Sequence, residues 1–464
     1  MKLPASSFGA IAVFLSGAAF AAPPTTLADL ADAAFARDEL AWDFVEGITT
    51  EVGPRQAGTE AEARGRAWAV GWLKANGFAN IKVEPYRMPT WVRGEERAEI
   101  VAPFAQPLRL TALGNSGSTG DAGLAADVVY FPSFADLEAA PAGSLAGKIA
   151  FIDHAMRRTQ DGSHYGVFGN VRRSGPNLAA SKGAAGVVIR SIGTENHRTP
   201  HTGGTSFAQG VTPIPAAALS NPDADNLVRM VRRAGGKPVR MQMVLTPRFL
   251  GETDSGNVTA DIVGRDPKLP PVLLACHLDS WDLGTGAIDD GAGCGIIAAA
   301  ASQVAKGGRP LRTVRLLFAG AEETGLWGSK AYAAAHKGQA IHAALESDFG
   351  ADRIWRIDSN FSKSDPALYR ELAQVVARFG VSPSTEVATG GADLNLARES
   401  GAAILDLQQD GTHYFDLHHT PDDTLDKIDP AALRQNVAVW TAVVGILANR
   451  AEPVGMTAPA AATP

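Results

Sequence analysis

The chain has 464 residues, of which 45% are apolar and 20% charged, so it is long enough to bury a large core and to carry a second module. Lysine and arginine number 42 against 49 aspartate and glutamate residues, which gives a formal net charge of -7 at pH 7. This balance excludes the strongly basic surface on which nucleic-acid binding depends, and we expect no nucleic-acid partner.

The first residues carry the pattern of an export signal. Lys2 precedes an apolar run from Phe8 to Phe20, and Ala19, Phe20 and Ala21 fit a small-x-small cleavage site. The run is too short for a membrane-spanning helix, and no later stretch approaches about 18 uninterrupted apolar residues. We therefore predict a signal peptide at 1–21, a secreted or periplasmic location, and no membrane span in the mature chain.

Two helices and a strand are predicted next. Residues 24–50 have the apolar spacing of an amphipathic helix. A second helix begins after Thr59, whose spacing to Glu62 is that of a capping box, and Gly77 stands where a helix-ending glycine belongs. A strand at 81–86 should follow.

The pattern of apolar runs and loops changes between residues 118 and 247. Short β-like runs alternate there with loops rich in glycine and proline. The runs are Asp127–Phe131, Lys148–Ile152 and Gly186–Ile189. One helix at 177–182 and a long loop at 191–212 complete the segment. We expect a separate, smaller β-rich module inserted into the larger fold.

From Asn257 onward, apolar runs alternate with helical patterns. The expected strands are Val272–Cys276, Thr313–Ala319, Ala343–Ser347 and Ala403–Leu407. The expected helices are Ala292–Ala305, Leu326–His336, Pro366–Phe379 and Pro430–Asn449. This alternation predicts an α/β fold with a mostly parallel central sheet and helices on both faces. The predicted domain plan is a main domain in two parts, an insert and a disordered tail, at 22–117 and 248–450, 118–247, and 451–464.

The two cysteines, Cys276 and Cys294, are too few for a disulfide scaffold. Cys276 lies in an apolar strand-like run and Cys294 at a helix start rich in glycine and alanine. We expect two buried free thiols, with a disulfide between them as the alternative because an oxidising compartment would permit one.

Acidic and histidine side chains follow the expected strands of the main domain, at the strand ends or in the next loops. They are His277, Asp279, Asp289, Glu322, Glu323, Asp348, His418 and His419. In open α/β sheets, ligand sites form at the carboxyl ends of the strands. Zinc takes imidazole and carboxylate ligands, and one carboxylate can bridge two ions about 3.5–4 Å apart.

Each of these residues would be unremarkable alone, since a single His-x-Asp turn or Glu-Glu pair is usually a surface feature. Gathered at one sheet edge, they indicate a two-metal centre. Of the pair Glu322–Glu323, one carboxylate can bind metal while the other accepts a proton. Asp279, two residues after His277, is placed to orient that histidine.

Five segments together are similar to the motifs of a known family. They are HLDSWDLGTGAIDDGAG (277–293), AGAEETGLWGS (319–329), ESDFG (346–350), GGADL (390–394) and YFDLHHTPDDT (414–424). The set resembles the co-catalytic zinc peptidases that include aminopeptidase S, glutamate carboxypeptidase II and plasma glutamate carboxypeptidase, and it is most similar to the last branch (carboxypeptidase Q-like). The resemblance covers nearly the whole mature chain, including GPRQAGT (53–59). The insert resembles a protease-associated domain through GKIAFID (147–153), GAAGVVIRSIG (183–193) and TPHTGG (199–204).

The resemblance implies two Zn²⁺ ions per chain and a complete set of ligands. The implied ligands are His277 and Asp348 for one ion, Glu323 and His419 for the other, and Asp289 as the bridge. His419 is chosen over His418 because the ligand in this family is followed by Ser or Thr, here Thr420.

Further roles are implied around the ligands. Glu322 is the implied general base, Asp279 the support of His277, and the peptide bond between Asp289 and Asp290 is expected to be cis. Tyr414 is a candidate to stabilise the transition state, with a packing role as its alternative. His201 of the insert is a candidate to reach the cleft, with an ordinary loop histidine as its alternative.

The sequence thus predicts a secreted zinc-dependent exopeptidase that hydrolyses peptides or dipeptides near a free terminus, through a metal-bridging hydroxide and Glu322. A receptor-like binding protein and a single-zinc acyltransferase like the glutaminyl cyclases are the alternatives, and the intact set of ligands argues against both. The motifs do not separate aminopeptidase, carboxypeptidase and dipeptidase activity, and a homodimer stays open.

Overall fold

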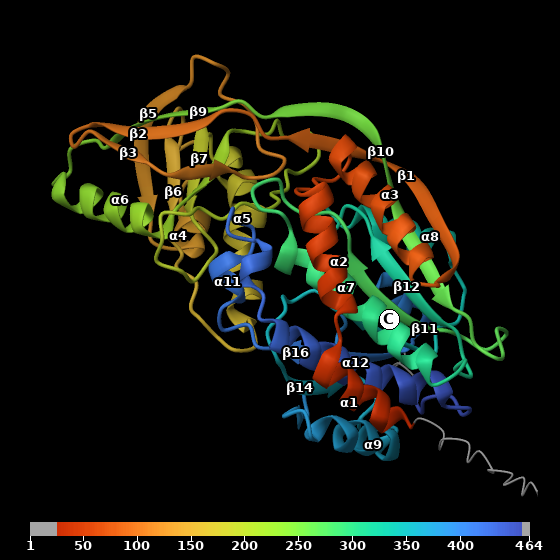
Figure 1. The fold of residues 1–464 in the computed structure, drawn as a ribbon. Helices are drawn as coiled ribbons and strands as arrows, with labels where there is room; N and C mark the ends of the chain where they lie inside the picture. Colours follow the sequence, from red (N-terminus) through yellow and green to blue (C-terminus); the bar gives the residue numbers. More distant parts are fainter. Residues whose placement is uncertain (1–25, 457–464) are drawn as a thin grey trace, which may run out of the picture.

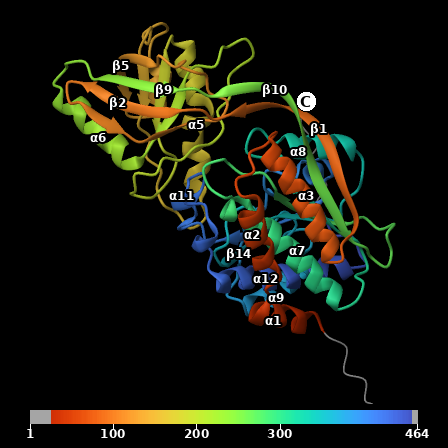
Figure 2. The same ribbon diagram turned by 45° about the horizontal axis from the view of Figure 1, so that its top comes forward.

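The computed structural model describes residues 26–456, which form two eight-stranded sheets surrounded by helices (Figure 1). The predicted signal peptide at 1–21 lies outside the described residues, as does most of the tail at 451–464. The two sheets occupy opposite ends of the molecule, and the long strands β1 and β10 run from one end toward the other in both views (Figures 1 and 2).

The first sheet has the strand order β1-β10-β12-β11-β13-β16-β14-β15. Its strands are β1 (Ala79–Val92), β10 (Arg248–Ile262), β11 (Val272–His277), β12 (Val314–Ala319), β13 (Ala343–Glu346), β14 (Ile354–Ser359), β15 (Ser382–Pro383) and β16 (Ala403–Gln409). The central strands β12, β11, β13 and β16 pair in parallel, while β1, β10 and β14 add antiparallel strands around them. The predicted α/β class with a parallel centre is confirmed.

Helices cover both faces of this sheet because the side chains of a strand alternate between the faces. On β11, Leu274 packs with the helices α7 (Ala292–Lys306) and α12 (Pro430–Asn449), whereas Leu273 packs on the opposite face near α8 (Trp327–Ala335). Helix α12 is long and apolar enough to span a membrane, but 83% of its most apolar window is buried within this fold, as in a core helix.

The remaining helices of this part pack around the sheet. They are α1 (Leu27–Arg37), α2 (Leu40–Gly47), α3 (Glu60–Ala75), α9 (Pro366–Ala377), α10 (Asn395–Ser400) and α11 (Tyr414–Leu417). The single helix predicted at 24–50 is wrong, because α1 and α2 are separated at Asp38. The backbone of Asp38 is extended, and its carboxylate accepts a hydrogen bond at 3.1 Å from Ala41 N, which lies in the first turn of the second helix.

The second sheet has the order β3-β2-β9-β5-β6-β7-β8-β4. Its strands are β2 (Glu96–Ala102), β3 (Gln106–Leu108), β4 (Leu110–Ala112), β5 (Leu124–Phe131), β6 (Ile149–Ile152), β7 (Gly186–Arg190), β8 (Ala216–Leu219) and β9 (Arg240–Leu245). Three of these strands, β2, β3 and β4, precede residue 118. They belong to the second sheet, because β2 pairs with both β3 and β9, and β4 pairs with β8. We therefore propose that the insert begins near Glu96, earlier than the predicted boundary.

Three helices accompany the second sheet, namely α4 (Phe134–Ala139), α5 (Ser163–Ser181) and α6 (Asn221–Arg233). Helix α5 begins much earlier than the helix predicted at 177–182. It contains Gly175 and Pro176, two residues that disfavour helices but are buried in the core here. Together with α11, α5 lies between the two ends of the molecule (Figures 1 and 2).

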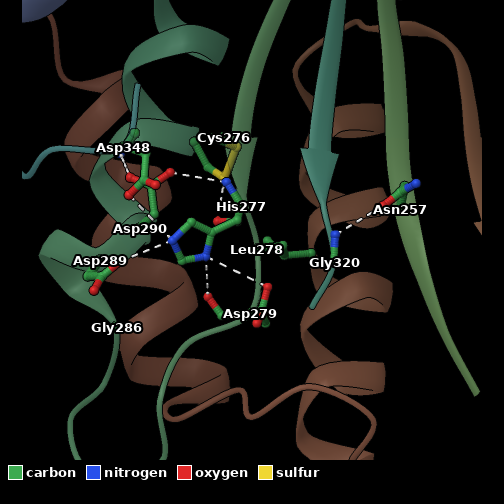
Figure 3. Close-up of a disulfide and its surroundings, with 12 residues drawn as sticks. Asn257, Cys276, His277, Leu278, Asp279, Gly286, Asp289, Asp290, Gly320 and Asp348 are labelled. Carbon is green, nitrogen blue, oxygen red and sulfur yellow. Dashed lines mark hydrogen bonds and ion pairs between the residues drawn. A yellow bond between two sulfur atoms is a disulfide. The ribbon is translucent and has the colours of Figure 1, made fainter. Parts of the chain in front are cut away.

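The two cysteines are paired, which corrects the expectation of free thiols. Cys276 near the end of β11 and Cys294 at the start of α7 form a disulfide with a Cα–Cα separation of 5.2 Å (Figure 3). Helix α7 packs back on β11, so two positions 18 residues apart in the sequence face each other at a distance that a disulfide spans. The sequence indicated that both positions are buried but not that they are in contact.

Candidate metal centre

The predicted ligands gather at one edge of the first sheet. Strand β11 ends at His277, β12 leads into Glu323, and β13 leads into Asp348. Because these three strands are parallel neighbours, their carboxyl ends lie side by side. Asp289 comes from the turn η2 (Ala287–Gly291), and His419 from the loop after α11.

Asp289 lies between two histidines. Its Oδ1 is 3.0 Å from Nε2 of His277, and its Oδ2 is 3.3 Å from Nε2 of His419. A second carboxylate accompanies each histidine, since Asp348 Oδ1 is 3.5 Å from His277 Nε2 and Glu323 Oε2 is 3.0 Å from His419 Nε2. The five side chains therefore form two groups that share one carboxylate.

These side chains fit a pair of zinc ions. Two ligands at Zn²⁺ distances of about 2.0–2.2 Å in tetrahedral geometry are about 3.3–3.6 Å apart, close to the spacings of 3.0–3.5 Å found here. Oδ2 of Asp289 and Oε1 of Glu323 are buried without a hydrogen-bond donor among residues 26–456. A cation between these carboxylates would compensate their buried charge.

Burial and the two histidines shift the pKa values of the three carboxylates. Burial raises the pKa of Glu323 and of Asp348, with the nearby His419 and His277, respectively, acting in the opposite direction. Burial would also raise the pKa of Asp289, but the hydrogen bond from His277 and the nearby ring of His419 hold it well below its ordinary value. The shared carboxylate therefore stays ionised between its two histidines.

His418 competes with His419 for the ligand position. The two rings are stacked with centroids 3.5 Å apart, and Nε2 of His418 is 3.6 Å from Oδ2 of Asp289. Of the two histidines, only His419 also lies within ion-pair distance of Glu323, at 3.0 Å. This geometry favours His419, the ligand that the sequence resemblance implies.

The peptide bond between Asp289 and Asp290 is cis, as predicted. The two carboxylates have different partners. Oδ2 of Asp290 accepts from His277 N at 3.1 Å, and Oδ1 accepts from Gly293 N at 3.1 Å, so this side chain ties the end of β11 to the start of α7 (Figure 3).

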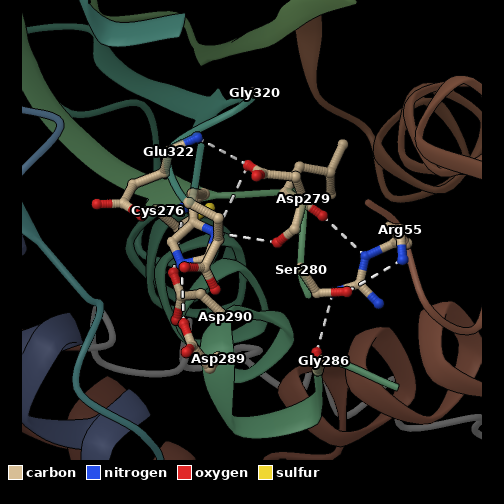
Figure 4. A network of polar contacts seen from close by, with 12 residues as sticks. Arg55, Cys276, Asp279, Ser280, Gly286, Asp289, Asp290, Gly320 and Glu322 are labelled. Atoms are coloured by element: carbon tan, nitrogen blue, oxygen red, sulfur yellow. Dashed lines mark hydrogen bonds and ion pairs between the residues drawn. The ribbon is translucent and has the colours of Figure 1, made fainter. Parts of the chain in front are cut away.

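Asp279 supports its neighbours in a different manner from the one predicted. The ring nitrogen Nδ1 of His277 donates to the backbone carbonyl of Asp279 at 2.9 Å, while the carboxylate is 3.7 Å from that nitrogen. The carboxylate instead accepts from the backbone N–H of Glu322 at 3.0 Å (Figure 4). Asp279 thus holds His277 through its backbone and Glu322 through its side chain.

Arg55 lies beside the loop between His277 and Asp289 and holds it in place (Figure 4). Its buried guanidinium donates to the carbonyl oxygens of Leu278, Thr285 and Gly286 at 2.6–2.9 Å. Gly286 has a positive φ of 63°, and a Cβ there would lie 2.7 Å from Nη2 of Arg55. Glycine is required at this point because the guanidinium lies against the backbone.

Glu322 lines the cleft beside Glu323 and Asp289. Its carboxylate has no hydrogen-bond partner within residues 26–456, in contrast to Glu323, which accepts from the indole nitrogen of Trp281 at 2.7 Å. Burial raises the pKa of Glu322 well above its ordinary value, with the charge of His277 acting in the opposite direction. A raised carboxyl pKa suits a group that exchanges protons near neutral pH.

The cleft has a volume of about 510 Å³ and also contains Tyr414. The ring of Tyr414 packs against Phe349 with centroids 4.9 Å apart, and burial raises its pKa well above its ordinary value, so its hydroxyl stays protonated. His201, the candidate of the insert to reach the cleft, does not line it. Both of its ring nitrogens are occupied, one by the carbonyl oxygen of His418 and the other by Glu195.

Sequence reasoning missed three residues that hold the site together. Trp281 donates to Glu323, Arg172 lies 3.3 Å from Nδ1 of His419, and Asp423 accepts from the backbone N–H groups of residues 287 and 288 at 2.7 Å. Trp281 and Asp423 lie inside motifs that the sequence singled out. Their roles were not visible because their partners are distant in the sequence.

A model of peptidase family M28 matches residues 257–444. Over 410 residues, the chain is 32% identical to carboxypeptidase Q of Bos taurus, and the match covers 87% of this chain and 84% of that protein. Carboxypeptidase Q of Homo sapiens is 32% identical over 408 residues, with the same two coverages.

Two solved structures share the fold. A peptidase M28 precursor from Shewanella amazonensis SB2B is 44% identical with a TM-score of 0.89, covering 92% of this chain and 97% of that one. An aminopeptidase from Aneurinibacillus sp. strain AM-1 is 21% identical with a TM-score of 0.62, covering 90% and 95%, a likeness of fold alone. The predicted fold is thereby confirmed.

Proposed function

The chain belongs to peptidase family M28, and from this membership we propose that it is a zinc-dependent exopeptidase that hydrolyses peptides or dipeptides next to a free terminus. The similarity to carboxypeptidase Q over most of both chains supports a peptidase of this kind. Imidazole and carboxylate donors together support zinc as the metal.

We propose that His277 and Asp348 hold one zinc ion, that Glu323 and His419 hold a second, and that Asp289 binds both. The observation that carries this proposal is the position of Asp289, whose two oxygens lie 3.0 Å and 3.3 Å from the two histidines. Two zinc ions at this place would supply Lewis acidity toward a peptide carbonyl and toward water.

Glu322 carries the proton transfers. Its carboxylate takes a proton from the water that attacks the peptide carbonyl and returns it to the leaving nitrogen. Three observations support this role: its free carboxylate, its place in the cleft wall, and the hydrogen bond from its backbone N–H to Asp279. The protonated hydroxyl of Tyr414 is the candidate donor to the substrate carbonyl oxygen.

The cleft favours a short substrate with a free carboxylate. Its volume of about 510 Å³ suits a small molecule rather than a folded protein. Arg172, Arg173 and Lys330 line it, and none of the three forms an ion pair with another residue of the described range 26–456. A carboxylate terminus would give these cations a partner and place the adjacent peptide bond near Glu322.

A comparison of three forms of one dipeptide tests this function. Zinc-loaded protein should hydrolyse the free dipeptide, and C-terminal amidation should lower kcat/KM by about 10- to 100-fold, the value of a hydrogen bond to a charged group. In Arg173→Met, which keeps the apolar stem, amidation should matter less. Efficient cleavage of internal bonds in a long peptide blocked at both ends would contradict an exopeptidase.

We also propose that the enzyme is exported. The pattern of residues 1–21 supports a signal peptide, and a disulfide between Cys276 and Cys294 is of the kind that persists in oxidising compartments. N-terminal sequencing of the mature protein should begin at Ala22, and a mature chain that begins at Met1 would contradict export by this signal.

A further inference from the structure

The loop that carries His419 lies against a tract from the other end of the molecule. This tract, residues 201–204, belongs to the long loop between β7 and β8 of the second sheet. The backbone N–H of Thr202 donates to the carbonyl oxygen of His419 at 3.0 Å. The ring nitrogen Nδ1 of His419 in turn contacts the carbonyl oxygen of Thr202 at 3.2 Å. The opposite ring nitrogen, Nε2, faces Glu323 and Asp289.

The backbone of His419 needs this support. Its φ is 63°, in the left-handed region that residues other than glycine seldom adopt. Such a conformation is unfavourable for a residue with a side chain and persists where the surroundings fix it. The paired contacts with Thr202 provide that constraint from outside the sheet that carries the other proposed ligands.

His201 extends the support to the preceding residue. Its Nδ1 donates to the carbonyl oxygen of His418 at 2.6 Å, because a carbonyl can only accept. Its Nε2 is 2.5 Å from Oε2 of Glu195, and the amide of Asn221 donates to the other oxygen of Glu195 at 3.2 Å. These contacts form a continuous polar chain from Asn221, at the start of α6 beside the second sheet, to the His419 loop. His201, Glu195 and Asn221 are all buried.

Glycines make this close approach feasible. A Cβ at Gly193 would lie 2.3 Å from Nε2 of His201, and one at Gly203, where φ is 135°, would lie 2.5 Å from the guanidinium of Arg172. Gly204 packs against the backbone of Glu323, with its Cβ position 3.2 Å from that carbonyl oxygen. The tract therefore touches both residues of one proposed metal position.

We propose that His201 is a positioning residue for His419, so that the second-sheet module sets the affinity of the Glu323/His419 metal position. The inference rests on the proposed zinc ligation. The other position is held within its own sheet, since Nδ1 of His277 donates to Asp279 and its N–H to Asp290. Loss of the His201 contacts should therefore lower the affinity for the zinc ion at the Glu323/His419 position and leave the affinity for the other ion unchanged.

Zinc titration of the full chain against a chromophoric chelator tests this asymmetry. Wild-type protein should bind two ions. His201→Ala should lower the affinity for one of the two by about tenfold, the low end for losing an outer partner of a metal ligand, because His201 acts through the backbone of His418. His201→Asn retains a donor toward His418 and should recover part of the affinity. The matched control is His197→Ala, an exposed histidine of the same loop.

Two further measurements separate positioning from folding. The melting temperature of each metal-free variant reports whether it folds, and Glu195→Gln, which keeps the size of the side chain, should weaken the same ion by a smaller factor. With cobalt in place of zinc, His201→Ala should also change the visible absorption spectrum, whereas His197→Ala should not.

The outcomes distinguish the two proposals. If wild-type protein binds two zinc ions and folded His201→Ala binds both with unchanged affinities, the positioning role is overturned and the proposed function stands. If both affinities fall equally, the asymmetry is overturned. If zinc-reconstituted wild-type protein binds no zinc, the proposed function and the positioning role are both overturned.

Discussion

The two halves of the proposed metal centre are supported by different parts of the chain. On the His277 side, the groups that hold the histidine itself lie within one continuous segment, because Asp279, Asp290 and the disulfide partner Cys294 all fall within 18 residues of Cys276. On the Glu323/His419 side, they come from elsewhere, namely Trp281 after β11 and Thr202 from the second sheet.

This difference separates local from long-range support. The groups that hold His277 itself need only β11, the residues after it and the start of α7 to be folded. The His419 side requires the two ends of the molecule to be packed against each other. Changes in the second-sheet module should therefore act on one half of the site, and the following substitutions are designed to separate the halves.

Glu322 belongs to neither half, and its substitution should have the largest effect. Glu322→Gln keeps the size and removes the proton acceptor, so kcat should fall by about 10²- to 10⁴-fold while zinc binding is retained. Glu399→Gln, at an exposed position, is the control. Near-normal turnover of Glu322→Gln would assign the proton transfer to another group.

Removal of the disulfide should act on stability and on the His277 half. The bridge closes a segment with a sequence separation of 18 residues. For a loop of this length, the entropy of the unfolded chain predicts a loss of about 3 kcal/mol in the free energy of unfolding. Denaturant unfolding of the double variant Cys276→Ala/Cys294→Ala measures this loss. An unchanged unfolding midpoint would show that the bridge contributes nothing to stability.

Trp281→Phe tests the Glu323 half. It keeps most of the ring and removes the indole N–H that donates to Glu323 at 2.7 Å. We expect one zinc ion to bind about 10- to 100-fold more weakly. Trp355→Phe is the matched control, because the buried indole nitrogen of Trp355 has no hydrogen-bond partner among the described residues. Equal effects of the two substitutions would argue against a role for the indole hydrogen bond.

Asp279→Asn should have the smallest effect on metal binding. The bond from His277 goes to the backbone of Asp279 and survives the substitution, and an amide oxygen can still accept from Glu322 N. We expect the loss in zinc affinity to stay below about tenfold, which is the low end for outer partners of a ligand. A loss as large as that of Trp281→Phe would show that the carboxylate itself supports His277.

Much of the main domain could be predicted because buried parallel strands leave long apolar runs. The strands β11 and β16 begin at the predicted residues for this reason. The proposed ligands follow such strands and gather as expected. The early turns of α5 were missed because core packing there overrides the low helix preference of glycine. The break at Asp38 was missed because the extended backbone of that residue ends α1, and the apolar spacing does not show this.

The support of His419 could not be predicted from the sequence. It depends on a backbone carbonyl, that of Thr202, and a carbonyl carries no signature in the sequence. His201 was singled out, but its contact with His418 spans 217 positions in the chain. The indole of Trp281 is a similar case, since its motif was visible and its partner was not.

The zinc content of the purified protein tests the two-metal centre most directly. Zinc-reconstituted wild-type protein, freed of loose metal and measured by elemental analysis, should contain two zinc ions per chain. Asp289→Ala should contain far less, because its carboxylate faces both histidines, whereas the surface variant Asp254→Ala should match the wild type. Wild-type protein without zinc, or Asp289→Ala with the full content, would contradict the two-metal centre.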